Sequence, residues 1–435
     1  MHTKSTSPGK SKLSLLAWII GLTVMVIICV TIGYSWFLMV IDEGGVFTLT
    51  FSPVDLDLDG DLDVLVHNRR NPGEFEVFAG GALWINQGGI QGGRAGQLVY
   101  QRNEIEGGLA STTAELNGDG EPDVLIFDGN RLILGLNQGG EQWKEGVYFN
   151  KSALIAAPLE QQKKFGQASQ YATLVVGDVD KDGRVDALVL GCCGRAFKVR
   201  EEDPDIPNFS WIWFNDVTVN DYVAGDVASL DALEGVPVGG AALADLDEDG
   251  DLDLVIVSLK SLTKTGAGPA GMILLNDGDG HFSVSGQHLS SAGASSLALG
   301  DLDHDDDPDI LIGDERGAGV WINQGGLQGG QAGTFSASEH PIAGSQTRSV
   351  VLDDLDSDGD LDALVVGKRR AALWWNDGQG HFTQAGQSFP CSERQNLTTG
   401  DFNSDGWEDI FIAKYDKTSQ VWFNNGKGGF RTGIH

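Results

Sequence analysis

Cysteine, proline and positive charge are all scarce in this chain of 435 residues. It has 4 cysteines and 12 prolines, and 29 lysines and arginines stand against 62 aspartates and glutamates, giving a formal net charge of −33. Four cysteines do not make the disulfide framework of a secreted scaffold, although pairing among Cys192, Cys193 and Cys391 stays open. The acidic balance argues against a nucleic-acid-binding protein, because phosphate recognition needs a basic surface.

Recognisable catalytic motifs are missing as well. The sequence has no Gly-x-Ser-x-Gly nucleophile elbow, and its histidines are scattered. His281 and His381 recur in equivalent turns, which indicates a structural role. We therefore expect no catalytic residue.

Charge is also absent from one long run near the N-terminus. Residues 1–12 are polar and carry three lysines, and no charged residue follows from Leu13 to Ile41. About 20 apolar residues span a bilayer, whereas a signal-peptide core has about 7–15. We predict a cytoplasmic tail (1–12), one transmembrane signal anchor (13–41) and an extracellular or periplasmic domain (42–435), because lysines precede the span. An atypical cleaved signal peptide is the alternative.

Seven acidic loops divide the rest of the chain. Oxygen-bearing side chains recur at positions 1, 3, 5 and 9, with Gly at position 6 in all loops except the fifth. Such a loop directs several carboxylates at one hard cation, and calcium suits it because calcium takes six to eight oxygens in flexible geometry. The predicted ligands, including several position-7 residues through their backbone carbonyls, are Asp55, Asp57, Asp59, Asp61 and Asp63 in loop one; Glu115, Asn117, Asp119 and Asp123 in loop two; Asp178, Asp180, Asp182, Arg184 and Asp186 in loop three; Asp245, Asp247, Asp249, Asp251 and Asp253 in loop four; Asp301, Asp303, Asp305, Asp307 and Asp309 in loop five; Asp354, Asp356, Asp358, Asp360 and Asp362 in loop six; and Asp401, Asn403, Asp405, Trp407 and Asp409 in loop seven.

We predict up to seven calcium ions from these loops. Loop two is the weakest candidate because Glu115 and Asn117 depart from the aspartate pattern. Loop five has Asp306 at position 6. Aspartate adopts the left-handed conformation more readily than most residues, so we expect loop five to keep its shape.

An EF-hand is excluded by the residues at the end of each loop. That motif needs a bidentate Glu at position 12 and a helix on both sides. Position 12 is apolar in every loop: Val66, Ile126, Val189, Ile256, Ile312, Val365 and Ile412. The loops therefore lead into buried strands.

The segments around the loops share one plan. A strand of small or β-branched residues precedes each loop, an apolar strand comes after it, a third strand ends in Asn, and a Gly-rich turn leads to a fourth strand. Four strands repeated seven times predict an all-β fold, a seven-bladed β-propeller of four-stranded blades preceded by one transmembrane helix. The outer strand of the last blade must be short, because the chain ends soon after Phe430. Tryptophans that share one position in the third strand favour packing between blades, with sugar stacking as the alternative: Trp84, Trp213, Trp321, Trp374 and Trp422.

These features resemble the FG-GAP/VCBS repeat family, the calcium-loop propellers of integrin α-subunit heads and of many bacterial surface proteins. The resemblance rests on Asp-x-Asp-x-Asp-Gly-x-x-Asp followed by a hydrophobic strand, and it covers about residues 46–435. It implies that each loop joins strands one and two of a blade and holds calcium. The Phe-Gly and Gly-Ala-Pro signatures of integrin blades are not clear here, so a membrane-anchored bacterial-type member is the nearer match.

Basic residues gather in the loops between strands two and three, on the face opposite the acidic loops. They are Arg69, Arg70, Arg131, Arg195, Lys198, Arg200, Lys260, Lys264, Arg316, Lys368, Arg369, Arg370, Lys414 and Lys417. We expect this face to meet a protein or an anionic glycan, the alternative being that these side chains only solubilise the loop tips. The expected function is a membrane-anchored, extracytoplasmic calcium-binding propeller for recognition, adhesion or assembly. The alternatives are a polysaccharide lyase or hydrolase and a carbohydrate-binding lectin on the same propeller.

Overall fold

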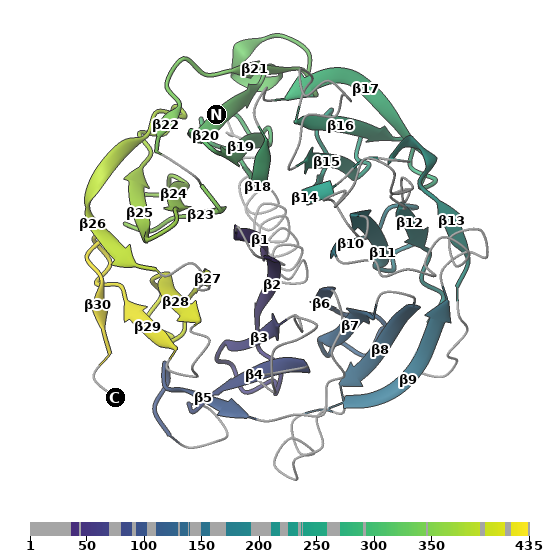
Figure 1. The fold of residues 1–435 in the computed structure, drawn as a ribbon, viewed down its shortest axis with the longest axis horizontal. Coiled ribbons are helices and arrows are strands. Elements are labelled where there is room, and N and C mark those ends of the chain that lie inside the picture. Colours follow the sequence, from purple (N-terminus) through teal and green to yellow (C-terminus); the bar gives the residue numbers. More distant parts are fainter. Residues whose placement is uncertain are drawn as a thin grey trace, which may run out of the picture.

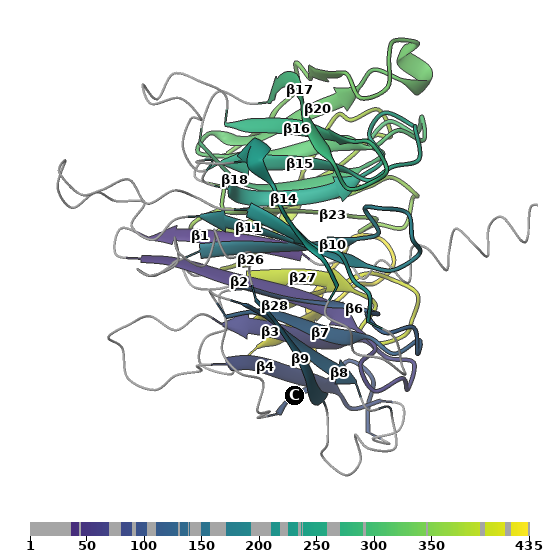
Figure 2. The ribbon, with the colours of Figure 1, turned by 90° about the vertical axis from the view of Figure 1, so that its right-hand side faces the viewer.

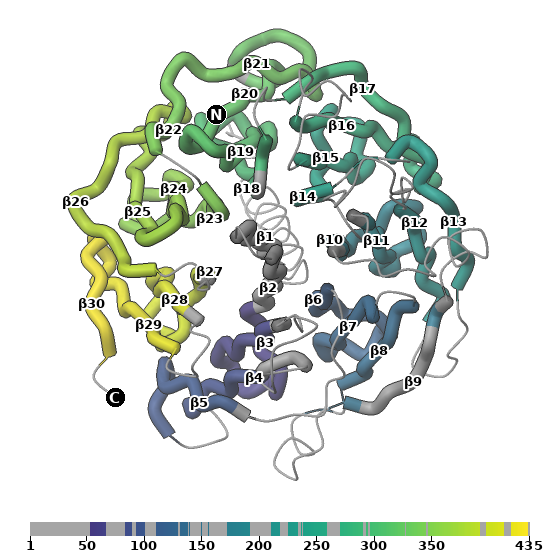
Figure 3. Tube along the Cα trace, viewed as in Figure 1, coloured from purple at the N-terminus to yellow at the C-terminus, as the bar shows by residue number. Residues whose placement is uncertain are grey.

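In the computed structural model, seven antiparallel sheets are arranged radially around a common centre, as Figure 1 shows. Figure 2 shows the same ring from the side. The structure describes residues 36–42, 45–68, 80–88, 93–101, 110–128, 131–137, 139, 149–156, 171–192, 210–217, 225–233, 236, 238–258, 270–289, 293–344, 347–391, 396–413 and 419–433. The chain passes through the sheets in order, so that the yellow last blade lies beside the first (Figure 3). The predicted all-β, seven-bladed propeller is confirmed.

Each blade places its strands in sequence order from the centre outward. Blade one has β1 (Trp36–Asp42), β2 (Gly45–Val54), β3 (Asp63–Asn68), β4 (Gly80–Asn86) and β5 (Leu98–Gln101); blade two has β6 (Ala110–Ala114), β7 (Asp123–Phe127), β8 (Arg131–Asn137) and β9 (Phe149–Ala156); blade three has β10 (Tyr171–Gly177), β11 (Asp186–Cys192), β12 (Ser210–Trp213) and β13 (Val227–Ser229); blade four has β14 (Val238–Ala244), β15 (Asp253–Ser258), β16 (Gly271–Asn276) and β17 (Phe282–Leu289). Blade five has β18 (Ala294–Gly300), β19 (Asp309–Asp314), β20 (Gly317–Asn323), β21 (Phe335–Ala337) and β22 (Ile342–Ala343); blade six has β23 (Ser349–Asp353), β24 (Asp362–Val366), β25 (Arg370–Trp375) and β26 (Thr383–Pro390); blade seven has β27 (Asn396–Gly400), β28 (Asp409–Ala413), β29 (Gln420–Phe423) and β30 (Arg431–Thr432).

The inner strands touch one another around the ring, which explains their small residues. Strands β14, β18 and β23 contact in succession, and β2 contacts both β6 and β27. A Cβ on Gly240 of β14 would lie 3.3 Å from Val257 Cγ2 and 3.6 Å from the Ser296 Cα of the next blade. The crowding near the axis thus selects residues with little or no side chain.

The hydrophobic core lies between neighbouring blades. Trp213 of blade three is fully buried and belongs to the same core cluster as Phe127 and Leu134 of blade two. Trp84 of blade one packs edge-on against Phe411 of blade seven, with ring centroids 5.9 Å apart. The recurrent tryptophans are therefore inter-blade core residues, as predicted, and burying such a ring contributes roughly 3–5 kcal/mol each.

The first sheet contains a strand that the sequence did not predict. Strand β1 pairs antiparallel with β2, with Trp36 opposite Phe51, and lies at the centre of the ring in Figure 1. It also contacts β14, β18 and β23 of blades four to six. The predicted transmembrane helix is therefore wrong over Trp36–Ile41. Residues 1–12 and the rest of the predicted span, 13–35, lie outside the described residues, and within the described part of the chain no helix is long and apolar enough to cross a membrane.

The outer strands vary between blades. In blade five, β21 and β22 both pair with β20, so its outer edge is covered by two short pieces. In blade seven, β30 has two residues and pairs only with Trp422 and Phe423, which confirms the predicted short outer strand. Among the described residues, no strand of blade seven pairs with a strand of blade one. Other contacts must therefore join these two blades.

Seven asparagines supply such contacts by linking each blade to the one before it. The Asn86 Nδ2 of blade one donates to the Phe402 carbonyl of blade seven over 2.8 Å and so closes the ring. The other links, all between 2.7 and 2.9 Å, run from Asn137 to Leu56, Asn215 to Leu116, Asn276 to Val179, Asn323 to Leu246, Asn376 to Leu302 and Asn424 to Leu355. The sequence shows the recurrent Asn, but its partner lies in another blade and could not be identified from the repeat.

Candidate metal centre

Each acidic loop folds around two of its own carboxylates, as loop one illustrates. The Asp55 carboxylate accepts the Asp59 N–H over 3.0 Å and the Gly60 N–H over 2.9 Å. The Asp63 carboxylate accepts the Leu56 N–H over 3.1 Å and the Asn86 N–H over 2.8 Å. Positions 1 and 9 thus fix the loop, and position 9 joins it to the strand that ends in Asn, which is β4 in blade one.

Two backbone positions in each loop are left-handed. Position 6 is a positive-φ Gly in most loops. Gly60 has φ 96°, and a Cβ added to it would meet nothing within 4 Å, so the backbone angle and not crowding selects glycine. Asp306 takes the same conformation with φ 73°, and its N–H bonds Asp301 over 3.0 Å, so loop five keeps its shape as predicted. Position 4 is also left-handed in all seven loops: Leu58, Gly118, Lys181, Glu248, His304, Ser357 and Ser404. The residue types at position 4 vary too much for the sequence to predict this conformation.

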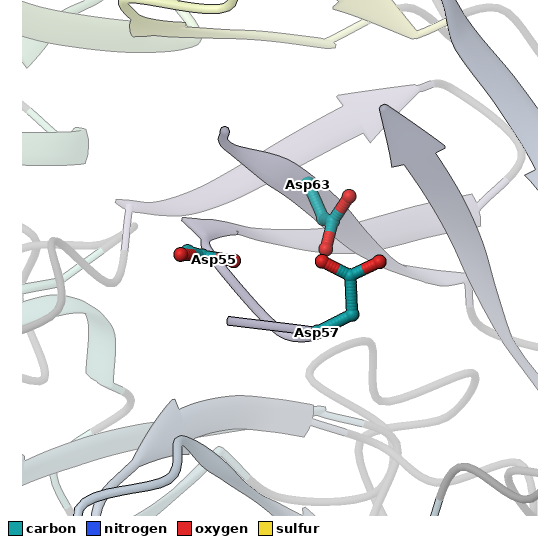
Figure 4. Close-up of side chains that lie close together, drawn as sticks. All are labelled: Asp55, Asp57 and Asp63. Atoms are coloured by element: carbon teal, nitrogen blue, oxygen red, sulfur yellow. The ribbon is translucent and has the colours of Figure 1, made fainter. Parts of the chain in front are cut away.

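Carboxylates of positions 1, 3 and 9 come together in five loops. In Figure 4 the Asp57 and Asp63 carboxylates face each other, with Asp55 beside them. In each cluster one oxygen per residue lies within 4.8 Å of the others: Asp55, Asp57 and Asp63; Asp178, Asp180 and Asp186; Asp245, Asp247 and Asp253; Asp301, Asp303 and Asp309; Asp354, Asp356 and Asp362. Position 5 lies outside these clusters, and the Asp59 carboxylate accepts the Asp61 N–H over 3.1 Å.

Burial makes ionisation of the carboxyl groups in these clusters energetically unfavourable. It raises the pKa of Asp63 well above its usual value, with the Asp57 charge adding to the effect. Burial likewise raises the pKa of Asp309 to about 7, and burial with the charges of Asp305 and Asp301 raises the pKa of Asp303 to about 6. Near neutral pH the clusters therefore favour a bound proton or a bound cation.

The clusters fit a cation because some buried oxygens lack a donor. In the described part of the chain, no N–H or O–H group reaches the buried Oδ1 atoms of Asp247, Asp303 and Asp356. An orphaned buried carboxylate oxygen costs free energy that a cation would recover. Three carboxylates at irregular positions on one loop match calcium, which accepts irregular oxygen geometry, better than magnesium, which demands an octahedron. When bound, calcium would be held by positions 1, 3 and 9 and would neutralise their charge.

Loops two and seven differ at position 3, where both carry Asn. The Asn403 amide donates to Asp409 Oδ2 over 3.1 Å, and the Asn117 amide donates to Asp119 Oδ2 over 3.0 Å. These loops therefore satisfy one of their own carboxylates from within. Neither forms a three-carboxylate cluster among the described residues.

Side chains at position 7 contact neighbouring loops. Lys181 at position 4 of loop three forms an ion pair with Asp251 at position 7 of loop four, and His304 of loop five contacts Asp360 of loop six in the same way. Burial and a hydrogen bond shared with Glu248 of loop four raise the pKa of Asp307 in loop five to about 7. Because the position-7 side chains engage the preceding loop, position 7 is left to offer its backbone carbonyl to a metal.

The basic loops are described only in part. Arg131 pairs with Asp128 over 2.8 Å and Arg316 with Asp314 over 3.1 Å, so their charges are largely neutralised locally. Arg369 and Arg370 are exposed, and Lys368 is half-buried beside them. The other predicted basic residues lie outside the described residues: Arg69, Arg70, Arg195, Lys198, Arg200, Lys260, Lys264, Lys414 and Lys417.

The fold of this chain is similar to that of a solved lectin. A lectin of Agrocybe aegerita that recognises non-reducing terminal N-acetylglucosamine is 19% identical, covering 81% of this chain and 87% of the lectin with a TM-score of 0.54, which shows the fold alone. An exotype rhamnogalacturonan lyase (11% identity, 91% and 72% covered, TM-score 0.41) and the fucose-specific lectin from Aleuria aurantia (12% identity, 92% and 96% covered, TM-score 0.33) are more distant. No curated protein matches the chain.

The family is identified by the repeats themselves. The profile of the FG-GAP-like repeat matches residues 115–189, 245–312, 301–365 and 354–401, which together make up more than half of the chain. Each match begins at position 1 of an acidic loop. With seven such loops, each joining two adjacent strands of a blade, the chain belongs to the FG-GAP-like repeat family.

Proposed function

We propose that this protein is a calcium-stabilised recognition module, held at a membrane by its N-terminus and displayed outside the cell or in the periplasm. The observation that carries the proposal is the set of five carboxylate clusters, of which those in loops four, five and six contain buried oxygens that no donor in the described residues satisfies. Calcium is abundant outside cells, where modules of this kind bind it at roughly 10⁻⁴–10⁻³ M. Binding would make the rigidity of the disc depend on that environment.

The direction of β1 supports an orientation for an anchored disc. Strand β2 runs toward loop one, and β1 is antiparallel to it, so the Trp36 end of β1 lies at the face that carries the acidic loops. A chain coming from an anchor over residues 13–35 would enter at that face. The acidic loops would then face the membrane, and the opposite face, with exposed Arg369 and Arg370, would be free to meet a protein or an anionic glycan.

Thermal melting of the full chain in lipid nanodiscs tests the calcium part of the proposal. Calcium at about ten times its Kd contributes about 1.4 kcal/mol per site, so five clusters give about 7 kcal/mol and a Tm rise of about 8 °C over chelated protein. Magnesium at the same concentration should give less than half of that rise. An unchanged Tm with no calcium retained after dialysis would contradict the proposal.

The recognition part needs a separate measurement. Elution of the full chain from immobilised heparin reports how strongly exposed basic loops bind an anionic polymer. The charge reversal Arg369→Glu should lower the salt needed for elution, with Lys427→Glu, away from that face, as the charge-matched control. Equal elution of both variants would count against a recognition role for the opposite face.

A further inference from the structure

A pocket of about 540 Å³ lies at the seam, the junction between blade seven and blade one. Blade one contributes Arg94 from the turn before β5, and blade seven contributes Asn403, Asp405, Phe423, Arg431 and Thr432. The two walls approach closely, because a Cβ on Gly96 would lie 2.5 Å from Phe423 Cε1 and 3.2 Å from Asn403 Cβ. The pocket therefore depends on the closed ring and on no single blade.

The junction between blades four and five provides an internal comparison for the seam. Its turn is a near-copy, since Gly333 corresponds to Gly96 and a Cβ there would lie 2.8 Å from Asp247 Cβ of blade four. At that junction the outer strand β17 is eight residues long, and the Gln287 side chain crosses to accept the Phe335 N–H over 2.8 Å and to donate to the Gly333 carbonyl. At the seam the outer strand β30 has two residues. The short strand leaves open the space that a longer outer strand occupies elsewhere.

The two junctions also differ in charge. Arg94 stands where blade five has Gln331, and Arg431 stands directly after Phe430, where blade four has Ser283 after Phe282. Both arginines are exposed, and within the described residues neither forms an ion pair, in contrast to Arg131, Arg184 and Arg316. In a chain of net charge −33, two unpaired guanidinium groups beside one pocket mark it as an anion site.

We propose that the seam pocket binds an acidic sugar residue through its carboxylate or sulfate group. A guanidinium group binds either anion with two parallel hydrogen bonds, so Arg94 and Arg431 would hold the charged group. Asp405 in the same wall repels a bare polyanion but accepts hydrogen bonds from sugar hydroxyls, and Thr432 can donate or accept. Phe423 adds an aromatic surface against which the apolar face of a sugar ring packs. Acidic loop seven forms part of this site through Asn403 and Asp405, and the site is independent of the opposite face assigned above.

Isothermal titration of the full chain in nanodiscs tests the pocket. The probes are digalacturonate, its methyl ester, a sulfated galactose disaccharide and inorganic phosphate. Digalacturonate or the sulfated disaccharide should bind, and the methyl ester should bind at least tenfold more weakly than digalacturonate. The variants Arg94→Gln and Arg431→Ser carry the residues that blades five and four use at these positions, so both should fold, which melting verifies. Each should weaken binding about tenfold, and the double variant should abolish it.

Control variants separate this pocket from the opposite face. Lys427→Gln removes a positive charge from the same blade outside the pocket and should leave the affinity unchanged. If Arg369→Gln with Arg370→Gln abolishes binding while Arg94→Gln does not, the seam inference fails and the recognition proposal stands. Phosphate binding as tight as that of the sugars, or no binding of either acidic sugar, would also overturn the seam inference.

Discussion

The five loops with Asp at position 3 and the two with Asn differ in chemistry but hardly in shape. Loops two and seven keep left-handed backbone at positions 4 and 6, as Gly118 (φ 83°) and Gly406 (φ 88°) show. They also keep the bonds from position 9, since Asp123 and Asp409 accept the N–H groups of Asn137 and Asn424. The loop fold is therefore set by positions 1, 4, 6 and 9. Position 3 decides whether a third carboxylate is present for a cation.

The largest expected effect comes from removing that difference. Replacing the position-3 aspartates of all five loops with asparagine should reduce calcium stabilisation from about 7 to about 2 kcal/mol, because losing one carboxylate weakens each site roughly tenfold. The positions are Asp57, Asp180, Asp247, Asp303 and Asp356. The metal-free variant should melt no lower than the parent, since an amide can donate inside the loop as Asn403 does. Scanning fluorimetry with and without calcium checks both statements.

The reverse exchange is the control for that experiment. Asn403→Asp should create a sixth three-carboxylate cluster, raise the number of calcium ions retained in equilibrium dialysis by one, and lower the Tm of the metal-free protein. A quintuple variant that kept the full calcium response would show that position 3 does not set the calcium requirement.

The effect of pH on the Tm of the metal-free protein is expected to be smaller. It tests position 9, whereas the preceding exchange tests position 3. Burial raises the pKa of Asp186, Asp362 and Asp409 to about 7 from an ordinary 3.8 in the metal-free protein. A raised folded-state pKa stabilises the folded protein below the unfolded value and loses this contribution as pH rises through about 7. The metal-free protein should therefore melt higher near pH 5.5 than near pH 8.

Calcium should remove that slope, because its ligands must be deprotonated to bind it. The Tm difference between calcium-loaded and metal-free protein should widen as pH rises through about 7. The quintuple variant should keep the part of the metal-free slope that comes from position 9, since the pKa of Asp409 is raised in a loop that already has Asn at position 3. Melting curves across this range measure both slopes. A metal-free Tm that rises with pH would contradict the assignment.

The repeat pattern makes the blades and loops predictable because each repeat carries its own strand periodicity and turn residues. The apolar position 12, as in Val66 and Ile256, distinguishes a strand from an EF-hand helix by residue type alone, and both residues lie in paired strands. The links between repeats are not predictable in this way. Asn86 bonds a carbonyl that lies 316 residues away, and the Asn403 amide takes the place of a carboxylate only through a contact with Asp409.

The one wrong prediction arose from an ambiguity of the pattern. An uncharged run rich in aromatic and β-branched residues suits a bilayer, but it also suits a strand enclosed by other strands. Trp36–Ile41 pairs with β2 and contacts the inner strands of three other blades. Periodicity does not separate the two environments, because neither has a polar side. The strand can be identified only from the three-dimensional structure, in which it lies at the centre of the ring.

The smallest expected effect concerns position 6 of loop five. Asp306 has φ 73° and makes the same N–H bond to position 1 as Gly359 does in loop six, so Asp306→Gly keeps the geometry and removes the strain. Relief of about 1 kcal/mol is partly offset by about 0.5 kcal/mol from the more flexible unfolded chain, leaving a net gain of about 0.5 kcal/mol. Gly359→Asp should cost a similar amount, and urea denaturation of both metal-free variants measures the pair. A loss of calcium from Asp306→Gly would instead mean that the Asp306 carboxylate binds the ion, and position 6 would then have to be counted among the ligands of loop five.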